Sequence, residues 1–252
     1  MYLSIIIPCY NEEKRLGKTL SRIHDFMSSQ SYSYEVIVVD NGSKDKTAEI
    51  ANSFQNKIPT LKVILRKSHG KGWAVKQGML EAVGEYRLFT DADNSTDISQ
   101  VDKLISYAKS GYDVVISSRK AKGAVLVPPQ PFHRIWLGNI FAFTVRHLLP
   151  LGDIKDTQNG FKLFTAESAT KIFRHQSIYY WAFDVEILTL AKAFGYKIVE
   201  VPIVWVNDER SKMNLKGMMR MAFEVFLIRL HFFTFDYSKL GDTPAKRLPP
   251  SK

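Results

Sequence analysis

Two carboxylates separated by a single residue, Asp91 and Asp93, directly follow a short apolar run in the sequence. Hard divalent cations take oxygen ligands, and Mg²⁺ is commonly held by one or two carboxylates together with substrate phosphates. Because Asp is also a favoured turn residue, a solvated turn is the competing interpretation. The position at the end of an apolar run favours the metal, and we predict that the pair binds a divalent cation.

Two further segments offer groups that suit a nucleotide. Asp40 follows the apolar run 36–39 and could accept hydrogen bonds from a base, or it could cap a turn or a helix within 40–43. Lys71 lies between two glycines at the start of a predicted helix, where backbone amides and an ammonium group can meet phosphate. The third glycine of a dinucleotide-binding fingerprint is missing, since Val75 stands in its place, and the segment does not follow the first strand.

Strands that alternate with helices would position these groups. The apolar, β-branched runs predict strands at 3–7, 35–39, 62–65, 86–89 and 113–116. The mixed segments between them have helical spacing and predict helices at 12–27, 46–54, 74–83 and 98–108. This alternation indicates βαβ units on a mostly parallel sheet flanked by helices. Because ligands bind outside the carboxyl ends of such strands, the polar segments that follow the first four strands are expected to converge at one edge.

Composition and charge limit the class of protein. The chain has 252 residues, of which 45% are hydrophobic and 24% charged, which fits one large globular domain or one domain with an appendage. With 35 Lys and Arg against 25 Asp and Glu, the net charge of +10 suggests anionic partners such as nucleotides, nucleic acid or lipid headgroups. The single cysteine, Cys9, excludes an intrachain disulfide and a zinc site built on several cysteines.

Two segments combine apolar bulk with basic charge, which is typical of helices that lie in a membrane interface. Residues 119–152 contain no acid, and in 215–233 the charged residues Lys216, Arg220 and Glu224 form one narrow stripe. A core helix with a solvated basic edge is the alternative. We expect attachment to a membrane surface through helices 132–149 and 215–233. A spanning helix is not expected, because the longest stretches without Asp, Glu, Lys or Arg have 11 residues and spanning needs roughly 20. The N-terminus lacks the basic leader of a secretory signal, which predicts a cytoplasmic protein.

Taken together, the motifs resemble those of a known family. The segments 4–13 (SIIIPCYNEE), 38–43 (VVDNGS), 70–72 (GKG) and 90–94 (TDADN) are similar to the nucleotide-sugar half of inverting family 2 glycosyltransferases, which have a GT-A fold. The segments 156–164 (DTQNGFKLF) and 181–188 (WAFDVEIL) resemble the polyprenyl-phosphate branch of that family, in particular its dolichyl-phosphate β-glucosyltransferases. The resemblance extends over about residues 1–235 and includes the basic pair Arg210 and Lys212 before the last helix.

The resemblance implies a role for each matching position. The nucleotide sugar would be bound by Pro8, Tyr10, Asn11, Glu12, Asp40, Gly42, Lys71, Gly72, Asp91, Ala92 and Asp93. Mg²⁺ or Mn²⁺ would be held by the DxD pair Asp91 and Asp93. The lipid phosphate would be bound by Arg119, Arg134, Lys162, Arg210 and Lys212. The implied catalytic residues are Asp93, Asp156 and Asp184, with Asp156 orienting the acceptor or the sugar. For Asp184 and Glu186, the alternative is a helix N-terminus that favours acids.

The implied reaction is the transfer of a hexose from a nucleotide sugar to dolichyl or polyprenyl phosphate, with inversion at the anomeric carbon. Ser95 and Lys162 differ from the mannose-transferring relatives, which favours UDP-glucose over GDP-mannose as the donor. A mannosyltransferase that uses GDP-mannose and a family 2 transferase with another acceptor remain alternatives. An NAD(P)-dependent oxidoreductase is disfavoured by the incomplete glycine fingerprint. A nucleic-acid-binding protein is disfavoured because the basic aromatic segments are too apolar for an open stacking surface.

The expected domain organisation follows from the same comparison. Residues 1–206 are predicted to form the GT-A catalytic domain, and 207–252 a membrane-associating amphipathic helix with a mobile tail. The protein is expected to bind peripherally to the cytoplasmic face of a membrane. Its oligomeric state is left open by the sequence.

Overall fold

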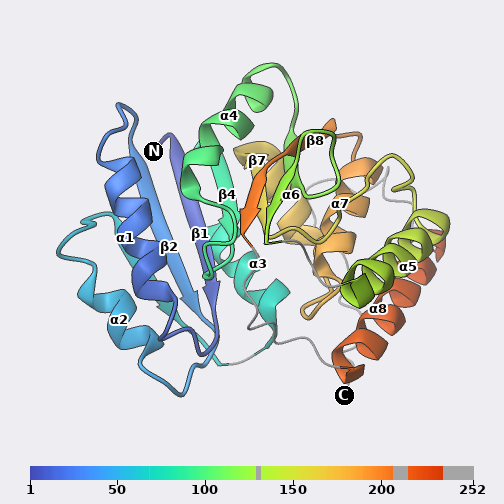
Figure 1. The fold of residues 1–252 in the computed structure, drawn as a ribbon, viewed down its shortest axis with the longest axis horizontal. Coiled ribbons are helices and arrows are strands. Elements are labelled where there is room, and N and C mark those ends of the chain that lie inside the picture. The colour runs from blue at the N-terminus through green and yellow to red at the C-terminus, as the bar shows by residue number, and fades with distance from the viewer. Residues whose placement is uncertain (68, 129–131, 207–214, 235–252) are drawn as a thin grey trace.

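The computed structural model describes residues 1–67, 69–128, 132–206 and 215–234, in which strands and helices alternate (Figure 1). The strands are β1 (Leu3–Cys9), β2 (Tyr34–Asp40), β3 (Leu61–Leu65), β4 (Tyr86–Thr90), β5 (Val114–Ser118), β6 (Val125–Val127), β7 (Phe161–Thr165), β8 (Ile198–Pro202) and β9 (Val204–Val206). The helices are α1 (Leu16–Met27), α2 (Thr47–Ser53), α3 (Lys71–Glu81), α4 (Val101–Lys109), α5 (Phe132–Leu148), α6 (Ala166–His175), α7 (Phe183–Ala193) and α8 (Leu215–Thr234), with the 3-10 helix η1 (Ile98–Gln100) before α4.

Seven strands form one sheet in the order β3-β2-β1-β4-β7-β5-β8, and β6 and β9 form a separate two-stranded ribbon. The large sheet is parallel except for β7, which runs antiparallel to both β4 and β5. Thr90, the last residue of β4, therefore pairs with Phe161, the first residue of β7. The loop that enters β7 consequently lies at the same edge as the carboxyl ends of β1, β2, β4 and β5. The predicted mostly parallel sheet flanked by helices is confirmed.

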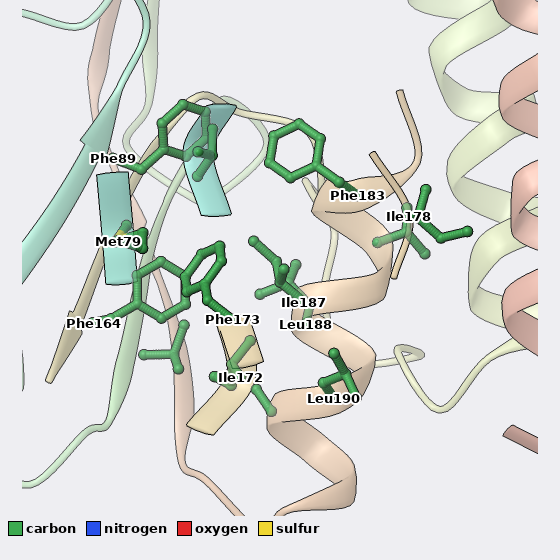
Figure 2. Packing of buried hydrophobic residues seen from close by; sticks show 14 of the residues in the cluster. Met79, Phe89, Phe164, Ile172, Phe173, Ile178, Phe183, Ile187, Leu188 and Leu190 are labelled. Atoms are coloured by element: carbon green, nitrogen blue, oxygen red, sulfur yellow. The ribbon is translucent and has the colours of Figure 1, made fainter. Parts of the chain in front are cut away.

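Helices cover both faces of the sheet because neighbouring strand residues point to opposite sides. Ile5 and Ile7 of β1 pack with α1 and α4, whereas Ile6 packs with α3, α6 and α7 on the other face. Aromatic rings fill this second layer: Phe89 of β4 lies 5.8 Å from Phe183 of α7, centroid to centroid (Figure 2). These strands are buried on both sides, which explains why their sequences are almost continuously apolar.

The boundaries show where local turns override the helical pattern. Each predicted strand is present, with ends within two residues of those expected. The helix predicted from residue 12 begins only at Leu16, because the chain first makes a turn in which Arg15 N and Leu16 N both donate to Glu12 O, at 2.9 Å each. Asn11 precedes this turn in the left-handed region, with φ 53°. The helix predicted over 98–108 begins as η1 and continues as α4.

Helices α5 and α8 lie side by side at the end of the molecule remote from α1 and α2 (Figure 1). Met221, Val225 and Ile228 of α8 belong to the same buried cluster as α7, so this face of α8 is core. The opposite face exposes a stripe, which we call the outer stripe: Met219, Phe223, Phe226 and Leu230, exposed by 68, 53, 57 and 52%. Among the described helices, none combines the length and the apolarity that crossing a membrane requires.

A buried acid connects α8 to the start of α7. Glu224 is 2% exposed, and its Oε2 accepts hydrogen bonds from the backbone amides of Trp181 and Ala182 at 3.1 and 3.0 Å. Ala182 is the residue before the first turn of α7, where amides lack partners within the helix. Arg220 donates to the other oxygen of Glu224 at 3.2 Å and lies over the ring of Tyr180. The predicted charged stripe of this helix therefore faces the protein at Glu224.

Candidate active site

The two carboxylates Asp91 and Asp93 lie where β4 ends and line an open cleft. Lys71, the first residue of α3, places its Nζ 2.6 Å from Oδ1 of Asp91. Asp93 accepts a hydrogen bond from the backbone amide of Ser95 at 2.9 Å. The other walls come from the loop before β7, the end of β5 and the ribbon strand β9. The lining residues are Thr90, Asp91, Asp93, Ser95, Thr96, Arg119, Gln158, Asn159, Gly160 and Trp205.

The electrostatics of this pair suit a cation. Burial and the neighbouring Asp91 carboxylate raise the pKa of Asp93 above its usual value, against the hydrogen bonds from Ser95. Burial lowers the pKa of Lys71, but Asp91, Asp184 and Asp93 outweigh it and hold the pKa above its usual value. No third His, Cys, Asp or Glu joins the pair among the described residues. Two carboxylates fit a Mg²⁺ or Mn²⁺ ion that takes its remaining ligands from water and a substrate diphosphate.

The absence of a side chain at Gly160 leaves room for the carboxylate of Asp91. The backbone amide of Asp91 donates to Gly160 O at 3.1 Å, so the backbone segments after β4 and before β7 are in direct contact. A Cβ atom at position 160 would lie 2.1 Å from Oδ2 and 2.4 Å from Cγ of Asp91. Such a distance is far below van der Waals contact, so any larger residue must displace the carboxylate. Gly160 was not among the site residues predicted from the sequence, although it lies within the motif 156–164.

We therefore expect Gly160→Ala to weaken Mn²⁺ binding by about 10- to 100-fold, the usual cost of losing a group that orients a metal ligand. Titration of the purified protein with Mn²⁺, followed by electron paramagnetic resonance, measures this directly. Gly152→Ala is the matched control, since a Cβ at 152 meets nothing within 4 Å. Equal Mn²⁺ affinity in the wild type and Gly160→Ala would show that Asp91 is not part of the metal site.

The predicted nucleotide-binding segments after β1 and β2 are brought together and interlock. Asn11 N donates to Ser43 Oγ at 2.9 Å, and Lys44 N donates to Asn11 Oδ1 at 2.9 Å. Oδ1 of Asp40 accepts from Ser43 N at 3.1 Å and also contacts Ser43 Oγ, so the turn that was the alternative for Asp40 does form. The contact of Asp40 with a base stays a prediction.

The remaining predicted nucleotide-binding residues are spread over the same edge. Tyr10 is 43% exposed directly after β1, whereas Glu12 is 9% exposed and accepts from Arg15 Nε at 2.6 Å. Pro8 lies inside β1, Gly42 has a φ of 80° in the turn after β2, and Ala92 is buried between the two carboxylates. A Cβ at Gly72 would meet Phe183 at 2.5 Å, so the close packing of α3 against α7 accounts for this glycine.

Across the cleft, Arg119 at the end of β5 is held by Asp156. The backbone amide and Nε of Arg119 both donate to Oδ2, at 2.9 and 2.8 Å, and its Nη2 donates to Oδ1 at 2.8 Å. Asp156 is 3% exposed, and its own amide donates to Glu200 at 2.8 Å. Burial raises the pKa of Asp156, but the charge and hydrogen bonds of Arg119 outweigh it and hold the pKa below its usual value. Asp156 is thus an ionised group that positions Arg119, rather than a base poised to take a proton.

Lys162 occupies a different place from the one predicted. Its side chain is completely buried, its Nζ donates to Asn159 O at 2.5 Å, and it forms a salt bridge with Asp184. A lysine enclosed in this way does not reach a lipid phosphate, and the prediction of such a contact is wrong for this structure. Asp184 is likewise 5% exposed and engaged by Lys162, which supports a structural role over direct catalysis. Arg210, Lys212 and the side chain of Arg134, also predicted to bind lipid phosphate, lie outside the part of the chain that is described.

A cleft that can bind a diphosphate through a shared cation, and an anionic acceptor through Arg119, suits the transfer of a group from a nucleotide to that acceptor. The same fold occurs in sugar-nucleotide transferases of known structure. Glucosyl-3-phosphoglycerate synthase from Mycobacterium tuberculosis, in complex with Mn²⁺, UDP-glucose and phosphoglyceric acid, aligns with a TM-score of 0.69 at 17% identity over 91% of this chain and 78% of that one. Mannosyl-3-phosphoglycerate synthase from Rubrobacter xylanophilus gives 0.69 at 18% identity, over 93% of this chain and 74% of that one.

The chain belongs to glycosyltransferase family 2, whose model, "Glycosyl transferase family 2", matches residues 4–173. The protein is therefore a glycosyltransferase, and the predicted family is confirmed. It is 39% identical over 246 residues to a dolichyl-phosphate beta-glucosyltransferase of Dictyostelium discoideum, which covers 92% of this chain and 75% of the relative. The human dolichyl-phosphate beta-glucosyltransferase is 34% identical over 247 residues, 92% of this chain and 76% of the relative.

Proposed function

We propose that the protein transfers glucose from UDP-glucose to dolichyl phosphate or a related polyprenyl phosphate, with inversion at the anomeric carbon. The observation that carries the proposal is the similarity to dolichyl-phosphate beta-glucosyltransferases over 92% of the chain, which includes the loop before β7 and helix α8 as well as the nucleotide half. The cleft supports it, because Arg119 and the carboxylate pair line the same cleft. GDP-mannose as the donor and a different acceptor are the alternatives that an assay must separate.

The proposed chemistry is a single displacement. An oxygen of the acceptor phosphate attacks the anomeric carbon, the bond from that carbon to the diphosphate oxygen breaks, and its electron pair leaves with UDP. Attack opposite the leaving group turns an α-linked donor into a β-linked product. A divalent cation bound at Asp91 and Asp93 would supply charge neutralisation for the leaving diphosphate. Lys71 lies beside the same carboxylates and adds positive charge to this side of the cleft.

The acceptor needs orientation more than it needs a base. A phosphate monoester has a second pKa of about 6 and is therefore largely dianionic at neutral pH. Arg119 is the group in the cleft that can bind such a dianion through its guanidinium, and Asp156 fixes the plane of that guanidinium. The lowered pKa of Asp156 agrees with a positioning role for this residue, because an ionised, fully engaged carboxylate is a weak proton acceptor.

Competition between donors tests the assignment. Radiolabelled UDP-glucose, UDP-N-acetylglucosamine and GDP-mannose are supplied in turn with a polyprenyl phosphate and Mn²⁺, and label is extracted into organic solvent. We expect kcat/KM to be largest for UDP-glucose. A larger kcat/KM for GDP-mannose would replace the glucosyltransferase with a mannosyltransferase. Transfer of glucose to a water-soluble acceptor but not to the lipid would overturn the acceptor.

We further propose that the protein binds peripherally to the cytoplasmic face of a membrane and that the outer stripe of α8 enters the interface. A lipid acceptor keeps its phosphate at headgroup depth, so the cleft must come to that plane. Ile140 and Phe143 of the neighbouring α5 are also exposed apolar residues, by 44 and 58%. The buried inner face of α8 shows that this helix also belongs to the fold. The boundary predicted at residue 207 lies outside the described residues, as does the predicted mobile tail 235–252.

Replacing Phe223, Phe226 and Leu230 by Ser is expected to weaken flotation with anionic liposomes and transfer to lipid, while UDP-glucose binding is retained. Each side chain contributes up to roughly 1.5–3 kcal/mol if fully removed from water. High salt should release the wild type only in part, since apolar contacts are not screened. The control replaces Leu65, Leu80 and Val83, exposed apolar residues outside α5 and α8, by Ser. Normal flotation of the α8 variant would mean that a different surface of the protein binds the membrane, or that another subunit covers this helix.

A further inference from the structure

One buried donor in the cleft has no partner in the protein. The Nδ2 atom of Asn159 is enclosed and makes no hydrogen bond within the described structure, although the residue is only 3% exposed. Asn159 nevertheless lines the cleft, in the loop that enters β7. Burying an amide without a partner is unfavourable, and native proteins leave few such groups. An unpaired donor at a binding site is accounted for when the ligand provides the acceptor.

The backbone around this amide is fixed by other groups. Asn159 O accepts from the buried Lys162, whose Nζ also meets Asp184. The next residue, Gly160, accepts from the amide of Asp91 and packs against its carboxylate. Asp156, three residues before Asn159, binds Arg119. The loop thus runs from Asp156, which binds Arg119, to Gly160, which contacts Asp91. Asn159 lies between these two contacts along the chain.

Within the described residues, the hydrogen bonds that hold this loop use the carbonyl of Asn159 and its neighbours, and the side-chain Nδ2 takes no part in them. Its chemistry suits the site instead. A neutral amide next to two carboxylates adds no further negative charge, so it does not repel a diphosphate. Its N–H groups match the oxygens that a sugar diphosphate offers, which are hydroxyl oxygens on the sugar and nonbridging oxygens on the phosphates.

We propose that the side-chain amide of Asn159 donates a hydrogen bond to an oxygen of the glucosyl diphosphate and so contributes to recognition of the donor. This inference rests on the proposed function, since it takes UDP-glucose as the ligand. It makes Asn159 a donor-binding residue outside the set that the sequence motifs indicated. The two sources of the oxygen differ in one respect: the sugar is present only in UDP-glucose, whereas the phosphates are present in UDP as well.

The test compares the wild type with Asn159→Leu, which has a similar volume and no donor, and with Asn159→Ala. Calorimetric titrations in the presence of Mn²⁺ measure the affinity for UDP-glucose and for UDP. We expect UDP-glucose to bind about tenfold more weakly to both variants, the loss of one hydrogen bond. If the oxygen belongs to the sugar, UDP affinity is unchanged, and if it belongs to the phosphates, UDP affinity falls by a similar factor.

Thermal unfolding of the free protein provides a second readout. Replacing an unpaired buried donor by an apolar group removes an unfavourable term, so the Tm of Asn159→Leu should equal or exceed that of the wild type. Wild-type affinity for UDP-glucose in both variants would overturn the inference and leave the proposed function standing. A lower Tm in both variants would overturn it too, since the amide would then be structural. Failure of the wild type to bind any sugar nucleotide would overturn the proposed function, and this inference with it.

Discussion

Asp93→Asn is expected to leave the fold intact and to lower kcat for sugar transfer by about 10²-fold or more, in the range seen when a group that stabilises transition-state charge is removed. The amide has the same shape as the carboxylate and keeps the acceptor for Ser95 N, so the turn after β4 should survive. The negative charge that would hold a divalent cation is lost. Circular dichroism verifies the fold, and initial rates over a range of Mn²⁺ concentrations measure the loss.

Asp97→Asn is the matched control for this variant. Asp97 lies four residues further on, caps η1 through a hydrogen bond from Ser99 N at 3.0 Å, and does not line the cleft. The same chemical change there should leave kcat within a factor of two or so, as for most surface substitutions. Undiminished turnover of the wild type in excess EDTA, with the protein shown to be metal-free, would contradict a metal-dependent mechanism and remove the reason for the effect at Asp93.

The second large effect is expected at Asp156. Asp156→Asn removes one partner of a buried ion pair, and such a change typically costs about 3–5 kcal/mol of the free energy of unfolding. Because the folded-state pKa of Asp156 is depressed, its stabilisation is present at neutral pH and is lost as the pH falls through the ordinary carboxyl range towards that lower pKa. Urea denaturation at pH 7 and at about pH 3.5 measures both parts. In the assay, the KM for the lipid acceptor should rise more than the affinity for UDP-glucose falls.

Another ion pair offers the control for Asp156. Lys192 and Asp153 form a salt bridge at 2.5 Å, but their side chains are 31 and 60% exposed. Asp153→Asn should therefore cost less than about 1 kcal/mol, as for surface pairs in general. If Asp156→Asn proved no more destabilising than Asp153→Asn, the enclosed Arg119–Asp156 contact would contribute little to stability. The acceptor KM would then be the only evidence that Asp156 fixes the position of Arg119.

The sequence predicted well whatever depends on local pattern. Continuous apolar runs such as 36–39 identify strands that are covered on both faces, and the polar residues that follow those strands meet at one edge, as expected. Asp91 and Asp93 were found for this reason, since their positions depend on a single strand end. The family motifs added the loop at 156–164, although the pattern did not reveal that this loop leads into a reversed strand, β7.

Pairings between distant segments could not be predicted in this way. The family resemblance assigned Lys162 to a lipid phosphate, but Asp184, 22 residues further along the chain, forms a buried pair with it. Gly160 and Asn159 lie within the motif 156–164, but the motif did not assign a role to either of them. Their importance comes from the approach of Asp91 in one case and from an unpaired amide in the other, and both are visible only in three dimensions. Trp205 reaches the cleft from the small ribbon strand β9, which was not predicted.

The contact of Glu224 with the amides of Trp181 and Ala182 bears on how the apolar outer stripe of α8 can be removed from this enzyme. Ending the chain before Leu215 would delete the apolar outer stripe, but it would also uncover the first turn of α7 and leave the cluster around Met221, Val225 and Ile228 without its cover. Asp184 lies in that same turn and pairs with Lys162 beneath the loop that carries Asn159. Truncation would therefore disturb the cleft through the first turn of α7 and the Asp184–Lys162 pair. Polar substitutions confined to the outer stripe of α8 would keep the cleft intact.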